Sequence, residues 1–387
     1  MSLFNNTKIA FSLKSDSELE RAFFLFNLIQ SQPMVKIGTA VTNFALKAHL
    51  PVEGLIRSTV FDHFCGGVTE EDCIPNIEKM HSNGVYSVLD YSVEGKETEE
   101  QFDIVKAKTL KNIEFAKKKD AIPFVVFKPT GVGRFSLYQK ITEKKPLSNE
   151  EKSEWDAVMN RYYEICDKAI KFDVPILIDA EESWMQDAAD VLVEGLMEKY
   201  NLDKAIVFNT LQMYRHDRME YLKDLQQKAL KGNYHIGLKI VRGAYMEKER
   251  ERAIENKYPS PICIDKNATD KNFNDAIKFI MEHDKMALFA GTHNEDSSYL
   301  LLDLAKRHNI TPKDNRLWFG QLYGMSDHIS FNLAKEGYNT AKYVPFGPVR
   351  DVMPYLIRRA EENTSVAGQT SRELNLIKEE RVRRKLE

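Results

Sequence analysis

The sequence predicts an α/β fold in which eight parallel strands alternate with helices and close into a (β/α)8 barrel. The first observation is a set of eight short, apolar, β-branched-rich runs: Val85–Asp90, Ile122–Lys128, Pro175–Ala180, Ala205–Thr210, His235–Val241, Met286–Ala290, Arg316–Gly320 and Thr340–Val344. These runs are too short for helices and too apolar for half-exposed strands, which is typical of parallel strands buried on both faces.

The second observation is helical periodicity between the runs, in Glu151–Lys171, Asp187–Tyr200, Arg215–Leu230, Asp270–Glu282, Ser298–His308 and His328–Lys335. Regular alternation of strand and helix favours a closed barrel. A doubly wound open sheet is the alternative that the same alternation permits.

The composition agrees with one large folded unit. The chain has 387 residues, of which 43% are hydrophobic and 29% charged, so a large core can form. The net charge of −3, with both signs interspersed, argues against nucleic acid as a partner. No run approaches the ~18 apolar residues of a membrane-spanning helix.

The cysteines and the N-terminus favour a cytoplasmic location. Cys65, Cys73, Cys166 and Cys263 form no CxxC pair, and they predict reduced thiols. Residues 1–14 lack the basic start and apolar run of a signal peptide.

We expect three segments along the chain: a helical extension over 1–80, the barrel over 81–366 and a charged helix over 367–387. In the extension, Ser17–Leu28 and Lys36–His49 are amphipathic. The last helix carries four basic residues, Arg381, Arg383, Arg384 and Lys385. We interpret it as a solvated helix, with a contact to a membrane surface or to a partner as the alternative.

Polar side chains gather where the predicted strands end. In a barrel these ends meet at one mouth, where function collects. The polar residues concerned are Lys128; Asp179, Glu181 and Glu182; Asn209 and Gln212; Lys239, Arg242 and Tyr245; Thr292, His293 and Asn294; Gln321 and Tyr323; and Tyr343. The same strand-end segments also contain Val241, Gly243, Ala244, Leu322 and Gly324. The sequence therefore predicts one polar site, and a solvated rim is the alternative.

The segment Asp351–Asn363 after the last strand has helical character. Tyr355, Arg358, Arg359 and Glu362 fall at i, i+3, i+4 and i+7, on one helix face. Adjacent arginines beside an aromatic ring suit capture of a carboxylate, because the planar guanidinium binds it through two hydrogen bonds. The alternative is a surface arginine pair with neighbouring glutamates as partners.

Neither a glycine-rich dinucleotide-binding turn nor a phosphate-binding loop is present. Strand-end side chains would therefore hold any nucleotide cofactor, and Lys239, Arg242, His293 and Gln321 suit a pyrophosphate and the polar edge of a flavin. We expect no metal site.

Five motifs in this order resemble the proline dehydrogenase family. They are Asp179-Ala180-Glu181-Glu182, Val241-Arg242-Gly243-Ala244-Tyr245, Thr292-His293-Asn294, Gln321-Leu322-Tyr323-Gly324-Met325 and Tyr343 followed by Tyr355-Leu356-Ile357-Arg358-Arg359. The resemblance covers about residues 60 to 366, and the chain length is similar to that of the monofunctional enzymes of mitochondrial type.

The resemblance implies a distorted barrel with its last helix over the mouth, and oxidation of L-proline to 1-pyrroline-5-carboxylate by hydride transfer to FAD. It implies a membrane quinone as electron acceptor, hence a peripheral position at the inner membrane, and a transient contact with pyrroline-5-carboxylate dehydrogenase. The resemblance implies that Arg358 and Arg359, with Lys128, bind the substrate carboxylate and that Asp179 orders this group. It also implies that four side chains pack around the pyrrolidine ring, namely Tyr245, Leu322, Tyr343 and Tyr355. The implied FAD residues are Gln212, Lys239, Val241, Arg242, Gly243, Ala244, Thr292, His293, Asn294, Gln321 and Glu362.

Two positions qualify the resemblance. Tyr343 matches the proline-specific form, because hydroxyproline-specific relatives have a smaller residue there. The family usually has Gly-Glu after the first helices, and that glutamate closes the site on the first arginine. Here Val68 follows Gly67. Either Glu70 or Glu71 substitutes, or this gate is absent.

Three other functions remain open for such a barrel. One is another flavin enzyme, such as a methylenetetrahydrofolate reductase-like protein. Another is an aldolase in which Lys128 or Lys239 forms a Schiff base. The third is a binding scaffold without turnover. A yellow colour that proline bleaches would separate them.

Overall fold

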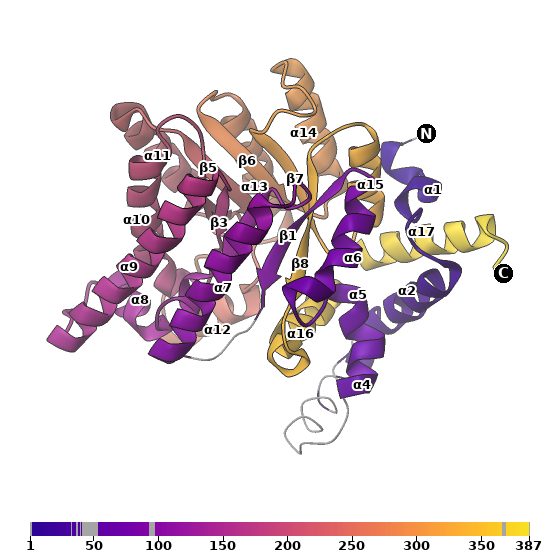
Figure 1. Ribbon diagram of the computed structural model, residues 1–387, viewed down its shortest axis with the longest axis horizontal. Helices are drawn as coiled ribbons and strands as arrows, with labels where there is room; N and C mark the ends of the chain where they lie inside the picture. Colours follow the sequence, from indigo (N-terminus) through magenta and orange to yellow (C-terminus); the bar gives the residue numbers. More distant parts are fainter. Residues whose placement is uncertain are drawn as a thin grey trace. The chain divides into compact units, whose positions relative to one another are not determined.

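The structure is a computed structural model, and it describes residues 2–31, 33–35, 38, 40, 53–92, 97–365 and 369–386. Eight strands form one closed barrel in chain order (Figure 1). They are β1 Val85–Tyr91, β2 Phe124–Phe127, β3 Ile176–Ile178, β4 Val207–Gln212, β5 Ile236–Val241, β6 Met286–Gly291, β7 Leu317–Leu322 and β8 Thr340–Phe346. Each strand lies within two residues of a predicted run at both ends. The barrel prediction is confirmed, and the open sheet is wrong.

The predicted helices are also present, with shifted ends. The longer helices are α2 Asp16–Ile29, α6 Glu70–His81, α7 Glu99–Lys117, α8 Phe135–Thr142, α9 Asn149–Phe172, α10 Ser183–Tyr200, α11 Arg218–Gly232, α12 Met246–Asn256, α13 Lys266–Met281, α14 Glu295–Arg307, α15 Asp327–Lys335, α16 Val349–Ser365 and α17 Gln369–Arg383. The short elements are η1 Leu3–Asn5, α1 Thr7–Ala10, α4 Glu53–Ile56, η2 Arg57–Phe61, α5 Asp62–Phe64 and η3 Pro129–Gly131. The predicted amphipathic segment Lys36–His49 falls almost wholly outside the described residues.

The chain divides into two compact units. The larger unit comprises Gly95–Thr292 and Asp296–Phe319, and the smaller unit comprises Met1–Glu94, His293–Glu295 and Gly320–Glu387. In the larger unit, β2 to β6 pair side by side in parallel, with Val125 opposite Ile176, Ile176 opposite Val207 and Phe208 opposite Gly237.

Aromatic side chains fill the core of the larger unit. The ring of Phe124 on β2 packs edge-on against Phe208 on β4, Phe289 on β6 and Trp318 on β7, with centroid distances of 5.2–5.5 Å. Phe124, Phe208 and Phe289 come from alternate strands, as the side-chain layers inside such barrels do. This packing holds the strands from which the site residues project.

In the smaller unit, the first and last helices pack together. Figure 1 shows α2 beside α17, and these helices make many contacts. Leu374, Leu376 and Ile377 of α17 are buried with Phe11 and Phe26. The prediction that the tail is a solvated helix is therefore wrong.

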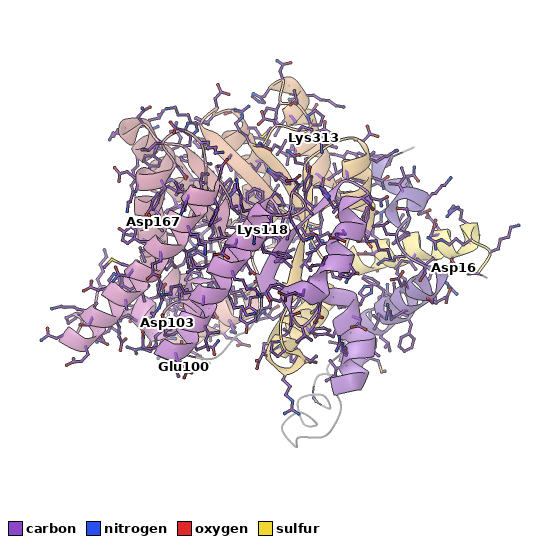
Figure 2. The ribbon with its side chains drawn as sticks, in the orientation of Figure 1. Asp16, Glu100, Asp103, Lys118, Asp167 and Lys313 are labelled. Atoms are coloured by element: carbon purple, nitrogen blue, oxygen red, sulfur yellow. The ribbon has the colours of Figure 1, made fainter. Side chains whose placement is uncertain are left out.

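The basic residues of α17 bond to this chain's own groups. Arg381 pairs with Glu20 at 2.6 Å and lies 3.8 Å from the ring centroid of Phe23. Arg384 donates to Asp16, labelled in Figure 2, at 3.0 Å and to the backbone oxygen of Phe11 at 2.8 Å. The sequence pattern of α17 does not show these partners, because they lie some 360 residues earlier in the chain.

Candidate active site

An ion pair joins two predicted site residues of the larger unit. Lys239 on β5 donates through Nζ to Asp179, which directly follows β3. Both side chains are largely buried. Because β3 and β5 are alternate strands, inward-facing residues on them belong to the same layer of the barrel. The buried pair fixes the lysine ammonium at the carboxyl ends of the strands.

Glu181, two residues further on, is buried and makes several hydrogen bonds. Its carboxylate accepts from the backbone N–H of Thr130 at 2.9 Å and from the Thr130 hydroxyl at 2.7 Å. Its backbone oxygen accepts from the Gln212 amide at 2.7 Å. Burial raises the pKa of Glu181 to about 7, while the charge of nearby Lys128 acts to lower it. The resemblance assigned no role to Glu181, which the sequence marked only as a polar strand-end residue within the Asp179-Ala180-Glu181-Glu182 motif.

Arg242 is held by side chains from two helices and from the loop after β6 in the larger unit. Its guanidinium donates to Asp270 on α13 at 2.7 Å, to the Thr292 hydroxyl at 2.8 Å and to the Ser297 hydroxyl on α14 at 3.0 Å. It also lies 4.5 Å from the centroid of the Phe273 ring. Sequence reasoning found Arg242 and Thr292 but missed Asp270 and Ser297, because neither lies at a strand end.

The turn after β5 is tightly packed. Gly243 has a φ of +135°, and a Cβ there would lie 2.5 Å from the Tyr214 ring. Only glycine suits this conformation and this close approach. The next N–H, that of Ala244, donates to the Gln212 side chain at 3.3 Å. The structure thus brings Gln212 together with the segment Val241–Tyr245, as predicted from the strand ends.

Two predicted substrate residues share an apolar cluster in the smaller unit. Tyr355 of α16 is buried in the cluster, and Leu322 at the end of β7 packs against it. The guanidinium of Arg359 lies 5.2 Å from the Tyr355 ring centroid. Arg359 is largely buried, while Arg358 is half-buried. The predicted helical spacing on α16 is confirmed, but the side chain of Glu362 lies outside the described residues.

The turn after β7 also requires a glycine. Gly324 has a φ of +77°, and a Cβ there would lie 2.2 Å from the backbone oxygen of His63. The N–H of Tyr323 donates to the backbone oxygen of Tyr343 on β8 at 2.8 Å. Gln321 is buried and accepts from the Ser330 hydroxyl at 2.8 Å.

Val68 packs against the same apolar cluster as Leu322 and Tyr355. Its neighbour Gly67 forms a parallel bridge with Phe346, the last residue of β8. Of the two nearby glutamates, Glu70 is buried and Glu71 is exposed. The position where the family usually has its gate glutamate therefore carries an apolar side chain in contact with this cluster.

The other predicted site residues lie at the ends of their strands. Lys128 follows β2 and is half-buried, and Tyr245 immediately precedes α12. His293 and Asn294, between β6 and α14, are also half-buried. His293 contacts the Ser326 hydroxyl through Nδ1 at 2.9 Å.

A metal cluster and a membrane-spanning helix are both absent from the described ranges. Among these residues, His, Cys, Asp and Glu side chains form no group of three or more that could hold a metal ion. No helix within the same ranges has the length and apolar character needed to cross a bilayer. All four cysteines are buried and free.

The fold and motif residues define a barrel enzyme with a polar set of strand-end side chains, and comparison with known proteins identifies its family. The family model described as proline dehydrogenase matches residues 73–372. The chain belongs to the proline dehydrogenase family, whose members are flavoenzymes.

Two relatives cover most of the chain. It is 35% identical over 334 residues to the carbapenem antibiotics biosynthesis protein CarD of Pectobacterium carotovorum subsp. carotovorum, covering 86% of each chain. It is 32% identical over 422 residues to mitochondrial proline dehydrogenase 1 of Arabidopsis thaliana, covering 97% of this chain and 85% of the relative.

Among solved structures, proline utilization A from Bdellovibrio bacteriovorus superposes with a TM-score of 0.72 at 21% identity. The match covers 93% of this chain but only 38% of that longer chain. At this identity the likeness supports the barrel fold alone. Family membership favours proline dehydrogenase over the aldolase and the other flavin barrel that the fold alone permits.

Proposed function

We propose that this chain oxidises L-proline to 1-pyrroline-5-carboxylate with FAD as its cofactor, the first step of proline catabolism. The observation that carries the proposal is the fixed set of donors in the larger unit. Lys239 and Arg242 are held by carboxylates, and Gln212 and Thr292 bond to the same strand-end segments.

This donor set fits the chemistry of FAD. The pyrophosphate is anionic and the reduced isoalloxazine gains negative charge, so both favour cationic groups and N–H donors. The ammonium of Lys239 and the guanidinium of Arg242 supply the charge. When bound, FAD supplies the hydride acceptor, and the chain's task is binding and orientation. The other FAD residues in this proposal are Val241, Gly243, Ala244, His293, Asn294, Gln321 and Glu362.

The substrate residues have a separate physical rationale. Arg358 and Arg359, with Lys128, bind the carboxylate, since paired guanidinium groups hold it in one orientation. Asp179 orders this cationic group. Tyr245, Leu322, Tyr343 and Tyr355 pack around the pyrrolidine ring and hold it for hydride transfer. A hydride leaves the carbon next to nitrogen and the amine loses a proton to water, which balances the two-electron oxidation.

The ion pair of Lys239 also bears on the Schiff-base alternative. A Schiff-base lysine must bring its amine nitrogen to the substrate carbonyl. Nζ of Lys239 instead donates to the Asp179 carboxylate, and both side chains are largely buried. Lys239 is therefore a better cofactor ligand than nucleophile.

Tyr343 sets substrate selectivity in this proposal. Its side chain is buried on β8, and we expect its ring to occupy the space that an added hydroxyl on the substrate would need. We expect kcat/KM for L-proline to exceed that for trans-4-hydroxyproline, measured by product formation. A preference for hydroxyproline would contradict the assignment.

The visible spectrum of the purified protein tests the function directly. We expect flavin absorption bands that anaerobic L-proline bleaches, with one equivalent of 1-pyrroline-5-carboxylate detected by mass spectrometry. A colourless protein that binds no added FAD would contradict the proposal, as would a flavin that L-proline does not reduce. Binding of FAD with reduction by NAD(P)H instead would support the other flavin enzyme.

The electrons must leave the enzyme, and we propose a membrane quinone as their acceptor. This requires a peripheral position at the inner membrane and, for product removal, transient contact with pyrroline-5-carboxylate dehydrogenase. Reoxidation of the proline-reduced protein by a soluble quinone analogue tests the first step. A reduced protein that only dioxygen reoxidises would contradict it.

A further inference from the structure

Two consecutive residues of the C-terminal helix α17 bond to Ser326 and to Glu295. Ser326 contacts His293, a proposed cofactor residue, and Glu295 lies two residues after His293 in the chain. Glu373 accepts from the backbone N–H of Ser326 through both carboxylate oxygens, at 2.8 and 3.0 Å. Arg372 donates to Glu295 at 2.7 Å. Glu295 begins α14, directly after His293 and Asn294.

Ser326 links Glu373 to His293. Its hydroxyl lies 2.9 Å from Nδ1 of His293, and its backbone is left-handed, with a φ of +52°. A left-handed conformation is uncommon in a residue other than glycine, and it persists only where the surroundings hold it. The carboxylate of Glu373 on the N–H of Ser326 is such a restraint, and it sets where the hydroxyl points.

The hydrogen bonds between Glu373 and Ser326 lie in a buried environment, which is unfavourable for a charged carboxylate. Glu373 is only 3% exposed and Ser326 is fully buried. Burial raises the pKa of Glu373, while the charge of His328 acts to lower it. Burying a carboxylate costs free energy unless its hydrogen bonds offset the loss of water. An apolar residue at position 373 would avoid this cost, so the glutamate serves the turn rather than the packing of α17.

The hydrogen bond from Arg372 to Glu295 restrains the segment that contains His293 and Asn294. Glu295 accepts from Arg372 and is 3.2 Å from Nε2 of His328 on α15. The start of α14 is therefore tied both to α17 and to the helix that follows the Ser326 turn. Together, the two bonds of α17 restrain the ring of His293 and the backbone that carries Asn294.

We propose that α17 is part of the flavin site, and that Glu373 and Arg372 are positioning residues for His293 and Asn294. This inference rests on the proposed function, in which His293 and Asn294 bind FAD. As positioning residues, Glu373 and Arg372 would act through His293 and Asn294 without touching the cofactor themselves. They fix the imidazole in advance, so that FAD meets a site that is already ordered.

The experiment compares Glu373→Leu with Glu380→Leu. Both glutamates are buried on α17, but among the residues that the structure describes Glu380 bonds to Arg383, Arg384 and Thr7 rather than to Ser326. We expect Glu373→Leu to raise the Kd for FAD about tenfold, the loss of one charge-assisted hydrogen bond. Glu380→Leu should leave that Kd within twofold. FAD binding is measured by quenching of flavin fluorescence.

Three further variants separate positioning from general damage. Glu373→Gln keeps an acceptor and should restore most of the affinity. In a His293→Ala background, Glu373→Leu should have no further effect on the Kd, because the restrained ring is gone. If Glu373→Leu does not fold, Arg372→Gln at a partly exposed site should weaken FAD binding about threefold.

Equal changes in Kd for Glu373→Leu and Glu380→Leu would overturn the inference, as would additive effects of Glu373→Leu and His293→Ala. These results are distinct from failure of the proposed function. If wild-type protein binds no FAD, the proposed function itself is wrong. If wild-type protein binds FAD and only the variants fail to differ, the role of α17 is wrong.

Discussion

Lys239 on β5 and Lys342 on β8 are both buried lysines that form an ion pair with an aspartate. Lys239 pairs with Asp179, at the end of a strand and among family motif residues. Lys342 pairs with Asp327, the first residue of α15, at 2.8 Å and also donates to the backbone oxygen of Met325. A buried lysine–aspartate ion pair thus orders a proposed site in the larger unit and anchors α15 to β8 in the smaller unit.

The partners of the aspartates explain this difference. Asp327 is shared by Lys342 and Lys14, the latter at 3.1 Å, and burial lowers the pKa of Lys342. Lys342 and Asp327 have side-chain exposures of 1% and 9%, so solvent reaches this pair little, while the side chain of Lys14 is 21% exposed. Asp179 keeps somewhat more exposure. A buried pair is therefore evidence of function only when its residues lie where a ligand can reach them.

Lys342→Met should have the largest effect on stability. Removing the ammonium leaves Asp327 with Lys14 as its remaining buried partner, and breaking a buried ion pair costs about 3–5 kcal/mol. Lys239→Met should cost less, because Asp179 is the more exposed carboxylate, but it should abolish FAD binding. Urea unfolding and FAD titration measure the two effects. Equal stability losses with FAD binding retained in both variants would contradict the comparison.

Arg359→Met should have the largest effect on turnover. Truncating one partner of a buried charge pair costs about 2–5 kcal/mol. This corresponds to a fall in kcat/KM for proline of roughly 30-fold or more. Arg383→Met, on the exposed end of α17, is the matched control and should change little. Steady-state kinetics within threefold of wild type for Arg359→Met would refute the substrate role.

His63 predicts how the smaller unit responds to acid. Burial is the main cause that lowers its pKa from 6.5 to about 3, and the charge of Lys14 lowers it further. The unfolded chain therefore binds more protons than the folded chain between pH 3 and 6.5. The stability that the neutral, buried His63 contributes is therefore fully present above pH 6.5, and it is lost as the pH falls from 6.5 towards 3.

The expected loss from His63 is about 3 kcal/mol between pH 6.5 and pH 4, at ~1.4 kcal/mol for each pH unit. His63→Gln retains a group that can bond to the Gly324 backbone oxygen but cannot titrate. The unfolding free energy of this variant should change less with pH over this range than that of wild type, as measured by urea unfolding at several pH values. Parallel pH profiles for wild type and variant would contradict the assignment.

The barrel could be predicted from the sequence because its strands are buried on both faces and so form continuous apolar runs. The strand-end residues followed from the barrel, since one end of each strand carries the polar groups. The contacts of α17 could not be predicted. Glu373 bonds to Ser326, and Arg384 to Asp16, across large sequence separations that no local pattern encodes.

The contact of Asp270 with Arg242 shows a second limit on what could be predicted from the sequence. Asp270 was expected near the start of a helix, and α13 does contain it. Its bond to Arg242 depends on the register between α13 and the turn after β5. A helix prediction gives no such register, so the carboxylate that holds the arginine was missed although the arginine was found.

Asp270→Asn tests this missed contact and should have the smallest effect of the series. The arginine would keep its bonds to Thr292 and Ser297 but lose its anionic partner. A charge-assisted hydrogen bond contributes about 1.5–3 kcal/mol and a neutral one about 0.5–1.5 kcal/mol. The difference of about 1–1.5 kcal/mol should raise the Kd for FAD roughly fivefold to 12-fold. Asp275→Asn, also on α13 and paired only with Lys271 and Lys278 among the ion pairs of the described residues, is the control. If both variants weaken FAD binding alike, the fixed orientation of Arg242 does not contribute to the site.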